Sequence, residues 1–182
     1  MAGNIKLQIC DNAADVAIQA AAAFAELVRA QPDAVIGLAT GSTPEASYAE
    51  MARLHRDSGL SFADVTSFNL DEYWGLGGDH DQSYRHFMND RLFQHIDINP
   101  WNTHVLNGKA RFPELECRSF EDRILAVGGI DLWLLGIGGN GHIAFNEPGS
   151  PVDSRTRLVS LTQETIESNS DGRFFSDASE VP

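Results

Sequence analysis

The sequence predicts an α/β fold, a mostly parallel sheet with helices on both faces. Short apolar segments alternate along the chain with longer segments whose apolar residues recur at helical spacing. No repeat or linker interrupts this alternation, and 182 residues are enough for one sizeable core. We therefore expect residues 1–182 to form a single domain, Rossmann-like in its layers.

The helices and strands can be placed in order along the chain. A first helix begins after Asp11 or Asn12, either of which is a suitable N-cap. Later helices are expected to begin near Pro44, Ser83 and Pro113. The second of these carries apolar residues at helical spacing as far as Ile96. Four apolar segments have the composition of strands: 34–39, 65–70, 103–106 and 130–135.

The carboxyl ends of parallel strands meet at one edge of a sheet, and ligands bind there in this class of fold. Three unusual segments follow predicted strands: 40–44, 71–74 and 136–149. We expect these three segments to meet around one ligand.

Composition narrows the class of ligand and the compartment. The net charge of −13 argues against a nucleic-acid or membrane surface, because such partners select basic patches. A small anion needs only a few local donors and stays compatible. Cys10 and Cys117 lack the spacing of a disulfide framework, which favours a cytoplasmic protein. No apolar run approaches the roughly 20 residues of a membrane span, and we expect no signal peptide.

The segment "GIGGNG", residues 136–141, matches the dinucleotide fingerprint G-x-G-x-x-G. That fingerprint needs a long helix after its third glycine, so that the helix N-terminus can hold the pyrophosphate. Here Pro148, Gly149 and Pro151 follow within ten residues of Gly141 and prevent such a helix. We therefore reject a nicotinamide or flavin site.

The same glycines give room to chemically active side chains in a tight turn. His142 follows directly, and Glu147 lies five residues further on. Histidine can both accept and donate a proton near neutral pH, and a nearby carboxylate orients its ring and supports its charged form. The simpler alternative is a histidine that only bonds to the backbone of the turn.

The segment "ATGSTPEAS" connects a strand to a helix and is a candidate anion site. The N-terminus of a helix offers free N–H groups and a partial positive charge. Ser42 and Thr43 add hydroxyl donors, and no Gly-Lys-Ser/Thr follows, so a nucleotide P-loop is excluded. We favour a phosphate monoester as the ligand. The alternative is a purely structural capping box between Ser42 and Glu45.

Asp71 and Glu72 follow the second predicted strand and precede two aromatic residues. Adjacent side chains of a strand point to opposite faces, so one acid is expected to reach the ligand while the other holds a loop. Burial beside Tyr73 and Trp74 would raise an aspartate pKa towards the range of a working base. A turn in which Asp71 only caps the next segment is the alternative.

The sequence does not favour a lysine Schiff base, a metal ion or a cofactor. The chain has two lysines, Lys6 and Lys109, and neither lies in one of the three segments, which argues against a Schiff base. The remaining histidines show no paired metal spacing, so we expect no metal ion and no cofactor.

These segments together carry a resemblance to a known family. "LATGSTP", "SFNLDEYWGL", "HDQSYRHFM", "LLGIGGNGHIAFNEPGS" and "SRTRLVSLT" resemble, in the same order, stretches of the glucosamine-6-phosphate deaminase family. The resemblance spans nearly the whole chain. It implies conversion of glucosamine 6-phosphate and water to fructose 6-phosphate and ammonia, within a deaminase/isomerase superfamily of α/β folds.

The resemblance also implies roles for individual residues. His142 would open the pyranose ring, assisted by Asn140 and Glu147. Asp71 would then take the proton from C2, and the resulting enolamine would be reprotonated at C1. The phosphate group would be held by Gly41, Ser42, Thr43 and Arg173.

Two departures from the family pattern concern charge. Many members carry an aspartate where this chain has Asn140, so Glu147 must do more to support a cationic His142. Some hexameric members have a regulatory phosphate site of serine, arginine and lysine. Ser150 and Arg157 match it, but Val159 stands where the lysine would be. Allosteric control is therefore not expected, and a homo-oligomer stays open for the full-length protein.

The polar tail from 162 to 182 closes no sheet, so we expect the domain to be incomplete at its C-terminus and weakly active or inactive by itself. Two other functions are compatible with parts of the sequence. A 6-phosphogluconolactonase would have a similar layout, but Tyr73-Trp74-Gly75 and Phe145-Asn146-Glu147 favour the deaminase. A sugar-phosphate sensor without turnover would not need both Asp71 and His142.

Overall fold

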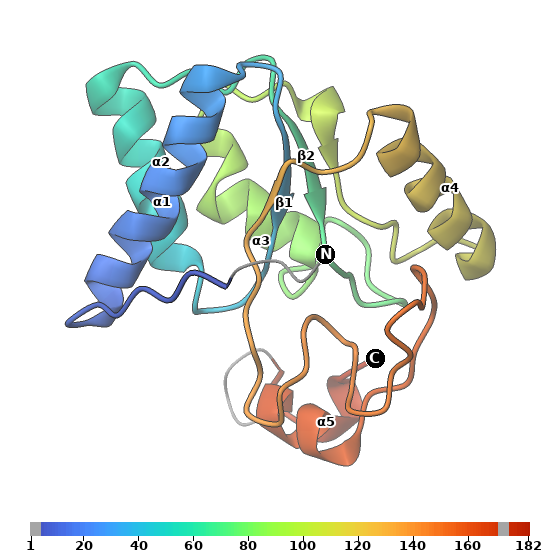
Figure 1. The fold of residues 1–182 in the computed structure, drawn as a ribbon. Helices are drawn as coiled ribbons and strands as arrows, with labels where there is room; N and C mark the ends of the chain where they lie inside the picture. The colour runs from blue at the N-terminus through green and yellow to red at the C-terminus, as the bar shows by residue number, and fades with distance from the viewer. Residues whose placement is uncertain (1–4, 171–174) are drawn as a thin grey trace.

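A parallel four-stranded sheet lies at the centre of the computed structural model, which describes residues 5–170 and 175–182 (Figure 1). The strand order is β3-β2-β1-β4, and all three pairings are parallel. The strands are β1 (Val35–Leu38), β2 (Thr66–Asn69), β3 (Thr103–His104) and β4 (Leu132–Trp133). The helices are α1 (Ala13–Ala30), α2 (Glu45–Ser58), α3 (Tyr84–Arg91), α4 (Pro113–Ala126) and α5 (Gln163–Ser170). The predicted α/β fold is confirmed.

Helix starts follow the capping residues that the sequence indicates. The Asn12 side chain accepts a hydrogen bond from the Asp15 backbone N–H at 3.0 Å, so Asn12 is the N-cap of α1. The Ser83 hydroxyl does the same for the His86 N–H at the start of α3, also at 3.0 Å. These bonds satisfy donors that have no partner within the helix.

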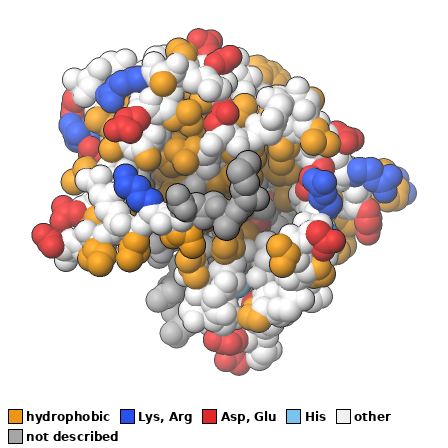
Figure 2. Space-filling model, viewed as in Figure 1, with side chains coloured by type: hydrophobic (Ala, Val, Ile, Leu, Met, Phe, Trp, Pro, Cys, Tyr) orange, Lys and Arg blue, Asp and Glu red, His pale blue; other side chains and the backbone are white. Residues whose placement is uncertain are grey.

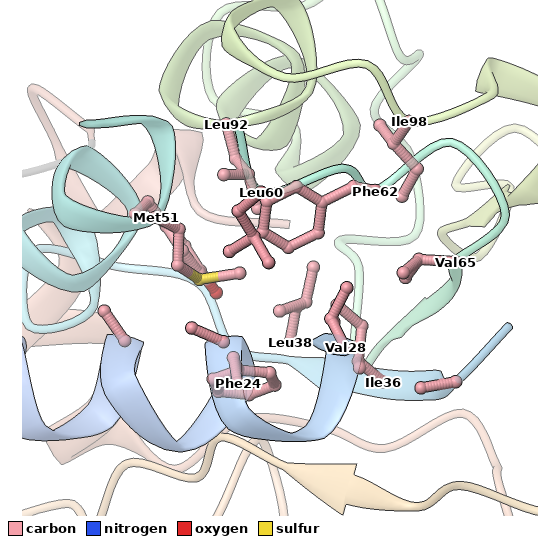
Figure 3. Packing of buried hydrophobic residues seen from close by; sticks show 14 of the residues in the cluster. Phe24, Val28, Ile36, Leu38, Met51, Leu60, Phe62, Val65, Leu92 and Ile98 are labelled. Carbon is pink, nitrogen blue, oxygen red and sulfur yellow. The ribbon is translucent and has the colours of Figure 1, made fainter. Parts of the chain in front are cut away.

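Alternate residues of the strands point to opposite layers, because side chains along a strand alternate between its two faces. Ile36 and Leu38 of β1 pack into the larger core, which α1, α2 and α3 cover (Figure 3). Val35 faces the other way, towards Phe68 of β2 and Phe120 of α4. Figure 1 shows α1 and α2 on one side of the sheet and α4 on the other.

Two expected elements differ in extent. The helix predicted to run as far as Ile96 ends at Arg91, because Leu92 leaves helical geometry with φ −139° and its side chain is fully buried. A short 3₁₀ turn, Phe93–His95, follows. The last predicted strand, 130–135, is shorter than its apolar sequence indicates. It forms only β4, whose two residues are half-buried, because β4 pairs on one side with β1 and stands at the edge of the described sheet.

Apolar side chains also lie at the surface near β4. Figure 2 shows hydrophobic side chains across the middle of the viewed face, with charged ones mostly nearer its edge. Leu135 and Ile137, just after β4, are 45% and 78% exposed. Within the described residues, no helix is long and apolar enough to cross a membrane.

No helix was predicted after residue 162, and that was wrong. Residues 163–170 form α5, which lies with the segments around it beyond the carboxyl ends of the strands (Figure 1). Its weak apolar pattern is the reason that it was missed. One signal was available, because Thr162 is a suitable N-cap and its hydroxyl accepts from the Thr165 backbone N–H at 3.3 Å.

Candidate active site

The loop after β1 leads into the N-terminus of α2. Gly41 has φ +106°, a left-handed conformation that glycine adopts without strain. Ser42 and Thr43 are exposed, and no side chain caps the first turn of α2. Glu45 instead lies 3.6 Å from the Arg91 guanidinium. The capping-box alternative is therefore wrong, and the helix start keeps donors for an anion.

Asp71 lies at the end of β2 beside this loop. The Thr40 hydroxyl donates to its carboxylate at 3.5 Å. Part of the residue touches solvent, but protein atoms surround its carboxyl group densely, and this burial raises the pKa of Asp71 to about 7. The negative charge of Glu72 adds to the rise, and the bond from Thr40 opposes it. Such a carboxylate is a stronger base than an ordinary aspartate.

Glu72 holds the neighbouring loop. Its carboxylate accepts hydrogen bonds from the backbone N–H groups of Tyr73 at 2.9 Å, Tyr84 at 2.8 Å and Arg85 at 3.0 Å. Two of these donors belong to the first turn of α3. The expectation that the two acids divide between ligand and loop is confirmed for the loop.

We expect Glu72→Ala to lower the free energy of unfolding by about 1–3 kcal/mol, because it leaves the N–H groups of Tyr84 and Arg85 without their acceptor. Urea unfolding followed by tryptophan fluorescence would measure the change. The matched control is Glu26→Ala on the exposed side of α1, which should change it by less than about 0.5 kcal/mol. Equal unfolding midpoints for the two variants would contradict this role of Glu72.

The segment after β4 forms a tight turn around His142, and no helix follows Gly141, as the rejection of a dinucleotide site requires. The His142 ring lies directly against Gly138. A Cβ on Gly138 would be 2.3 Å from Cε1 and 2.4 Å from Nε2 of the ring. Gly138 also donates its N–H to the His142 carbonyl at 2.8 Å. Because Gly138 has no Cβ, the His142 ring has room to lie against the backbone.

Asn140 connects His142 to Glu147. The Asn140 carbonyl oxygen accepts from the ring Nδ1 at 2.7 Å and from the His142 backbone N–H at 3.1 Å. The Asn140 amide donates to Glu147 Oε2 at 3.3 Å, and that oxygen lies 3.9 Å from Nδ1. Because the carbonyl only accepts, the neutral ring carries its proton on Nδ1, and Nε2 is left as the proton acceptor.

Aromatic rings join the second and third segments. Tyr73, two residues after Asp71, lies with its ring centroid 5.1 Å from that of Phe145. Tyr84 at the start of α3 stacks on Phe145 at 6.0 Å. The pKa of Tyr84 is raised by burial and by the charge of Asp71, so its hydroxyl stays protonated. Tyr84 was not among the predicted site residues. Its signal was an aromatic residue directly after a helix N-cap.

The structure brings the predicted site residues together in two separate clusters. Asp71 contacts the anion loop through Thr40, and Asn140, His142 and Glu147 form a second cluster. A cleft of ≈ 620 Å³ is lined by Asp71, Glu72 and Phe145, whereas Ser42 and His142 do not line it. Arg173 lies outside the described residues.

The two residues matched to a regulatory site lie together. The Arg157 guanidinium donates to the Ser150 hydroxyl at 3.1 Å and also to Asn146 and Ser154. No group of three or more His, Cys, Asp or Glu side chains suited to a metal ion occurs among residues 5–170 and 175–182.

The loop at the start of α2, the buried Asp71 and the oriented His142 follow β1, β2 and β4 of one parallel α/β sheet, which is the class of fold that binds ligands beyond the carboxyl ends of its strands. The family model described as glucosamine-6-phosphate isomerases/6-phosphogluconolactonase matches residues 10–171, and the chain belongs to this family. A solved structure of a monomeric glucosamine-6-phosphate deaminase superposes with a TM-score of 0.94 at 44% identity, covering 98% of this chain and 73% of that one. The chain therefore belongs to the glucosamine-6-phosphate deaminase family.

Two further comparisons show that the chain is more similar to a deaminase than to a 6-phosphogluconolactonase. Glucosamine-6-phosphate deaminase 1 of Giardia intestinalis is 58% identical over 170 residues, covering 93% of this chain and 63% of the relative. The chain thus spans a little under two thirds of that relative. A 6-phosphogluconolactonase from Thermotoga maritima has 26% identity and a TM-score of 0.63, covering 75% of this chain and 61% of that one. The lactonases share the fold at a greater distance.

Proposed function

We propose that the protein is a glucosamine-6-phosphate deaminase, which converts glucosamine 6-phosphate and water to fructose 6-phosphate and ammonia. The observation that carries the proposal is the placing of Asp71 directly beside the anion loop, with its pKa raised to about 7. A base next to a phosphate-binding loop suits proton abstraction from a small phosphorylated sugar. The deaminase structure that superposes on the chain supports the same substrate.

The proposed reaction begins with binding and ring opening. Gly41, Ser42 and Thr43, with Arg173, hold the phosphate. The Nε2 atom of His142 accepts the proton of the O1 hydroxyl, and the protonated ring returns a proton to O5, so that the C1–O5 bond breaks. Asn140 keeps the ring oriented, and the carboxylate of Glu147 stabilises its charged form.

Proton abstraction and deamination follow. Asp71 removes the proton from C2, O1 of the C1 carbonyl takes a proton from water and becomes a hydroxyl, and an enolamine forms. Protonation at C1 gives an iminium group at C2. Water adds to this carbon and ammonia leaves, which yields the ketose phosphate. No cofactor is needed for these steps, because every proton moves between substrate, water and side chains.

The rate is expected to rise with pH through about 7, since Asp71 must be ionised to act as the base and its pKa is raised to about 7. The pKa of Glu147 is lowered, so this carboxylate is already ionised over that range. A profile of kcat/KM between about pH 5 and about pH 9 measures the acid limb. A limb that is flat down to about pH 5 would contradict the role of Asp71.

A coupled assay for ammonia, run on the full natural chain with glucosamine 6-phosphate, tests the proposal directly. Hydrolysis of 6-phosphogluconolactone in its place would favour the lactonase. Calorimetric binding of glucosamine 6-phosphate without ammonia release would favour a sensor.

Partners and compartment follow from the same proposal. A small sugar phosphate is the proposed partner, and we propose no nucleic acid or membrane surface for this acidic chain. Cys10 and Cys117 are both unpaired, which suits the reducing cytoplasm. Ser150 and Arg157 stay the candidates for a regulatory phosphate, but Arg157 is already bonded within the protein and Val159 supplies no charge. The superposed deaminase is described as monomeric, so we propose no obligate oligomer.

A further inference from the structure

The two oxygens of the Glu147 carboxylate face different parts of the protein. Oε2 faces Asn140 and the His142 ring, as described above. Oε1 faces the start of α5, where it accepts hydrogen bonds from the hydroxyls of Thr162, at 3.0 Å, and of Thr165. The Thr162 backbone N–H adds a longer bond of 3.4 Å.

Thr165 is well placed to fix this carboxylate. It is only 6% exposed, and its hydroxyl belongs to the first turn of α5. Thr162 caps the same turn through the Thr165 backbone N–H at 3.3 Å. The helix start and the carboxylate therefore form one hydrogen-bonded unit, in which neither hydroxyl turns without breaking a bond.

The threonine hydroxyls also lower the pKa of Glu147, against the effect of burial. Burial raises the pKa of this carboxyl group, but hydrogen bonds from Thr165, Thr162 and Asn140 outweigh burial and hold it below its ordinary value. Among residues 5–170 and 175–182, the titratable group in contact with Glu147 is His142, whose Nδ1 lies 3.9 Å from Oε2. Without the threonine donors, the remaining partners on Oε2 would have to hold the charge alone.

The opposite half of α5 contacts the other side of the site. The Asn169 amide donates to the Tyr73 hydroxyl at 2.9 Å, and Tyr73 lies two residues after Asp71. The helix is thus tied both to the loop of the aspartate and to the carboxylate behind the histidine. This arrangement makes α5 a support for both halves of the site.

We propose that Thr162 and Thr165 are positioning residues for the ring-opening histidine, which act by fixing the Glu147 carboxylate so that its Oε2 supports Asn140 and His142. The inference rests on the proposed function for its catalytic consequence. The geometric part concerns the protein without substrate. The chemistry is that of a hydrogen-bonded support behind an acid–base group, in which each donor restricts the carboxylate to one orientation.

The test compares Thr165→Val, which keeps the shape but removes the hydroxyl, with Thr165→Ser, which keeps the hydroxyl. Thr156→Val is the matched control, because the Thr156 hydroxyl donates to another carboxylate, Glu121, at 2.7 Å. The first measurement is an NMR titration of the Glu147 side-chain carboxyl carbon in the full natural chain without substrate. Glu147→Gln assigns the resonance.

We expect the Glu147 carboxyl in Thr165→Val to titrate at higher pH than in the natural protein, with Thr165→Ser and Thr156→Val unchanged. In the ammonia assay, kcat/KM of Thr165→Val should fall by about tenfold to a hundredfold, the factor that one hydrogen bond to a charged group contributes. Thr165→Ser should recover most of the rate.

An unchanged Glu147 titration in Thr165→Val would overturn the inference. So would a rate loss of the same size in Thr165→Ser and Thr156→Val, because it would reflect general destabilisation. If the titration shifts as expected but the natural protein releases no ammonia, the proposed function fails while the support of Glu147 stands.

Discussion

Asp71→Asn is expected to lower kcat/KM for glucosamine 6-phosphate by about 10²–10⁴-fold, the contribution of one positioned acid–base group. The side chain keeps its size and can still bond with Thr40, but the amide cannot accept the C2 proton. The anion loop lies on a different strand connection and is unchanged, so substrate should still bind.

Exchange of the C2 proton with deuterated water isolates this step from ring opening and from ammonia release. The variant should bind glucosamine 6-phosphate in calorimetry yet lose the exchange. Asp64→Asn is the control, since this exposed aspartate lies before the opposite end of β2. Exchange at the natural rate in Asp71→Asn would remove Asp71 from the role of base.

Gly138→Ala is expected to reduce kcat/KM by about 10²-fold, the cost of misplacing a catalytic group by about 1 Å. The new Cβ would lie 2.3 Å from Cε1 of the His142 ring, far inside van der Waals contact, so the ring must leave its place. Its bond with Asn140, at 2.7 Å, would then be lost or bent. Phosphate binding does not depend on this turn and should persist.

Gly139→Ala is the matched control, because a Cβ at Gly139 meets nothing within 4 Å and no left-handed φ is needed there. The His142 ring protons, observed by NMR without substrate, should shift in Gly138→Ala and stay in place in Gly139→Ala. Equal activity of the two variants would show that the glycine is not needed for the histidine. Equal loss would point to the turn as a whole.

Local sequence signals were sufficient for most of the helices and strands. Capping by Asn12 and Ser83 depends on contacts within three residues, so it can be read from the chain. The strands of the sheet were recognised because their apolar residues are contiguous. The end of α3 was not predicted correctly, because Leu92 leaves the helix and packs into a core that is built from distant elements.

For the candidate site, the sequence indicates residues but not the hydrogen bonds that join them. The sequence indicated Asp71, His142 and Glu147, but gave no sign that Glu147 would be held by Thr162 and Thr165. Those partners lie 15 and 18 residues away across an irregular segment, and no local pattern specifies such a contact. The capping box at Ser42 failed for the same reason, because Glu45 pairs with Arg91 of α3.

The sequence by itself determined the α/β layers, the starts of α1 to α4 and the three segments that carry acids, hydroxyls and an imidazole, since helix caps and apolar alternation act over a few residues. Only the tertiary structure decided that Glu72 is the carboxylate that holds the loop, that Gly138 leaves room for the His142 ring, and that α5 donates hydrogen bonds to Glu147. The physical reason is the distance along the sequence over which the interactions act. A side chain's ionisation and orientation depend on burial and donors that the folded chain brings from distant positions.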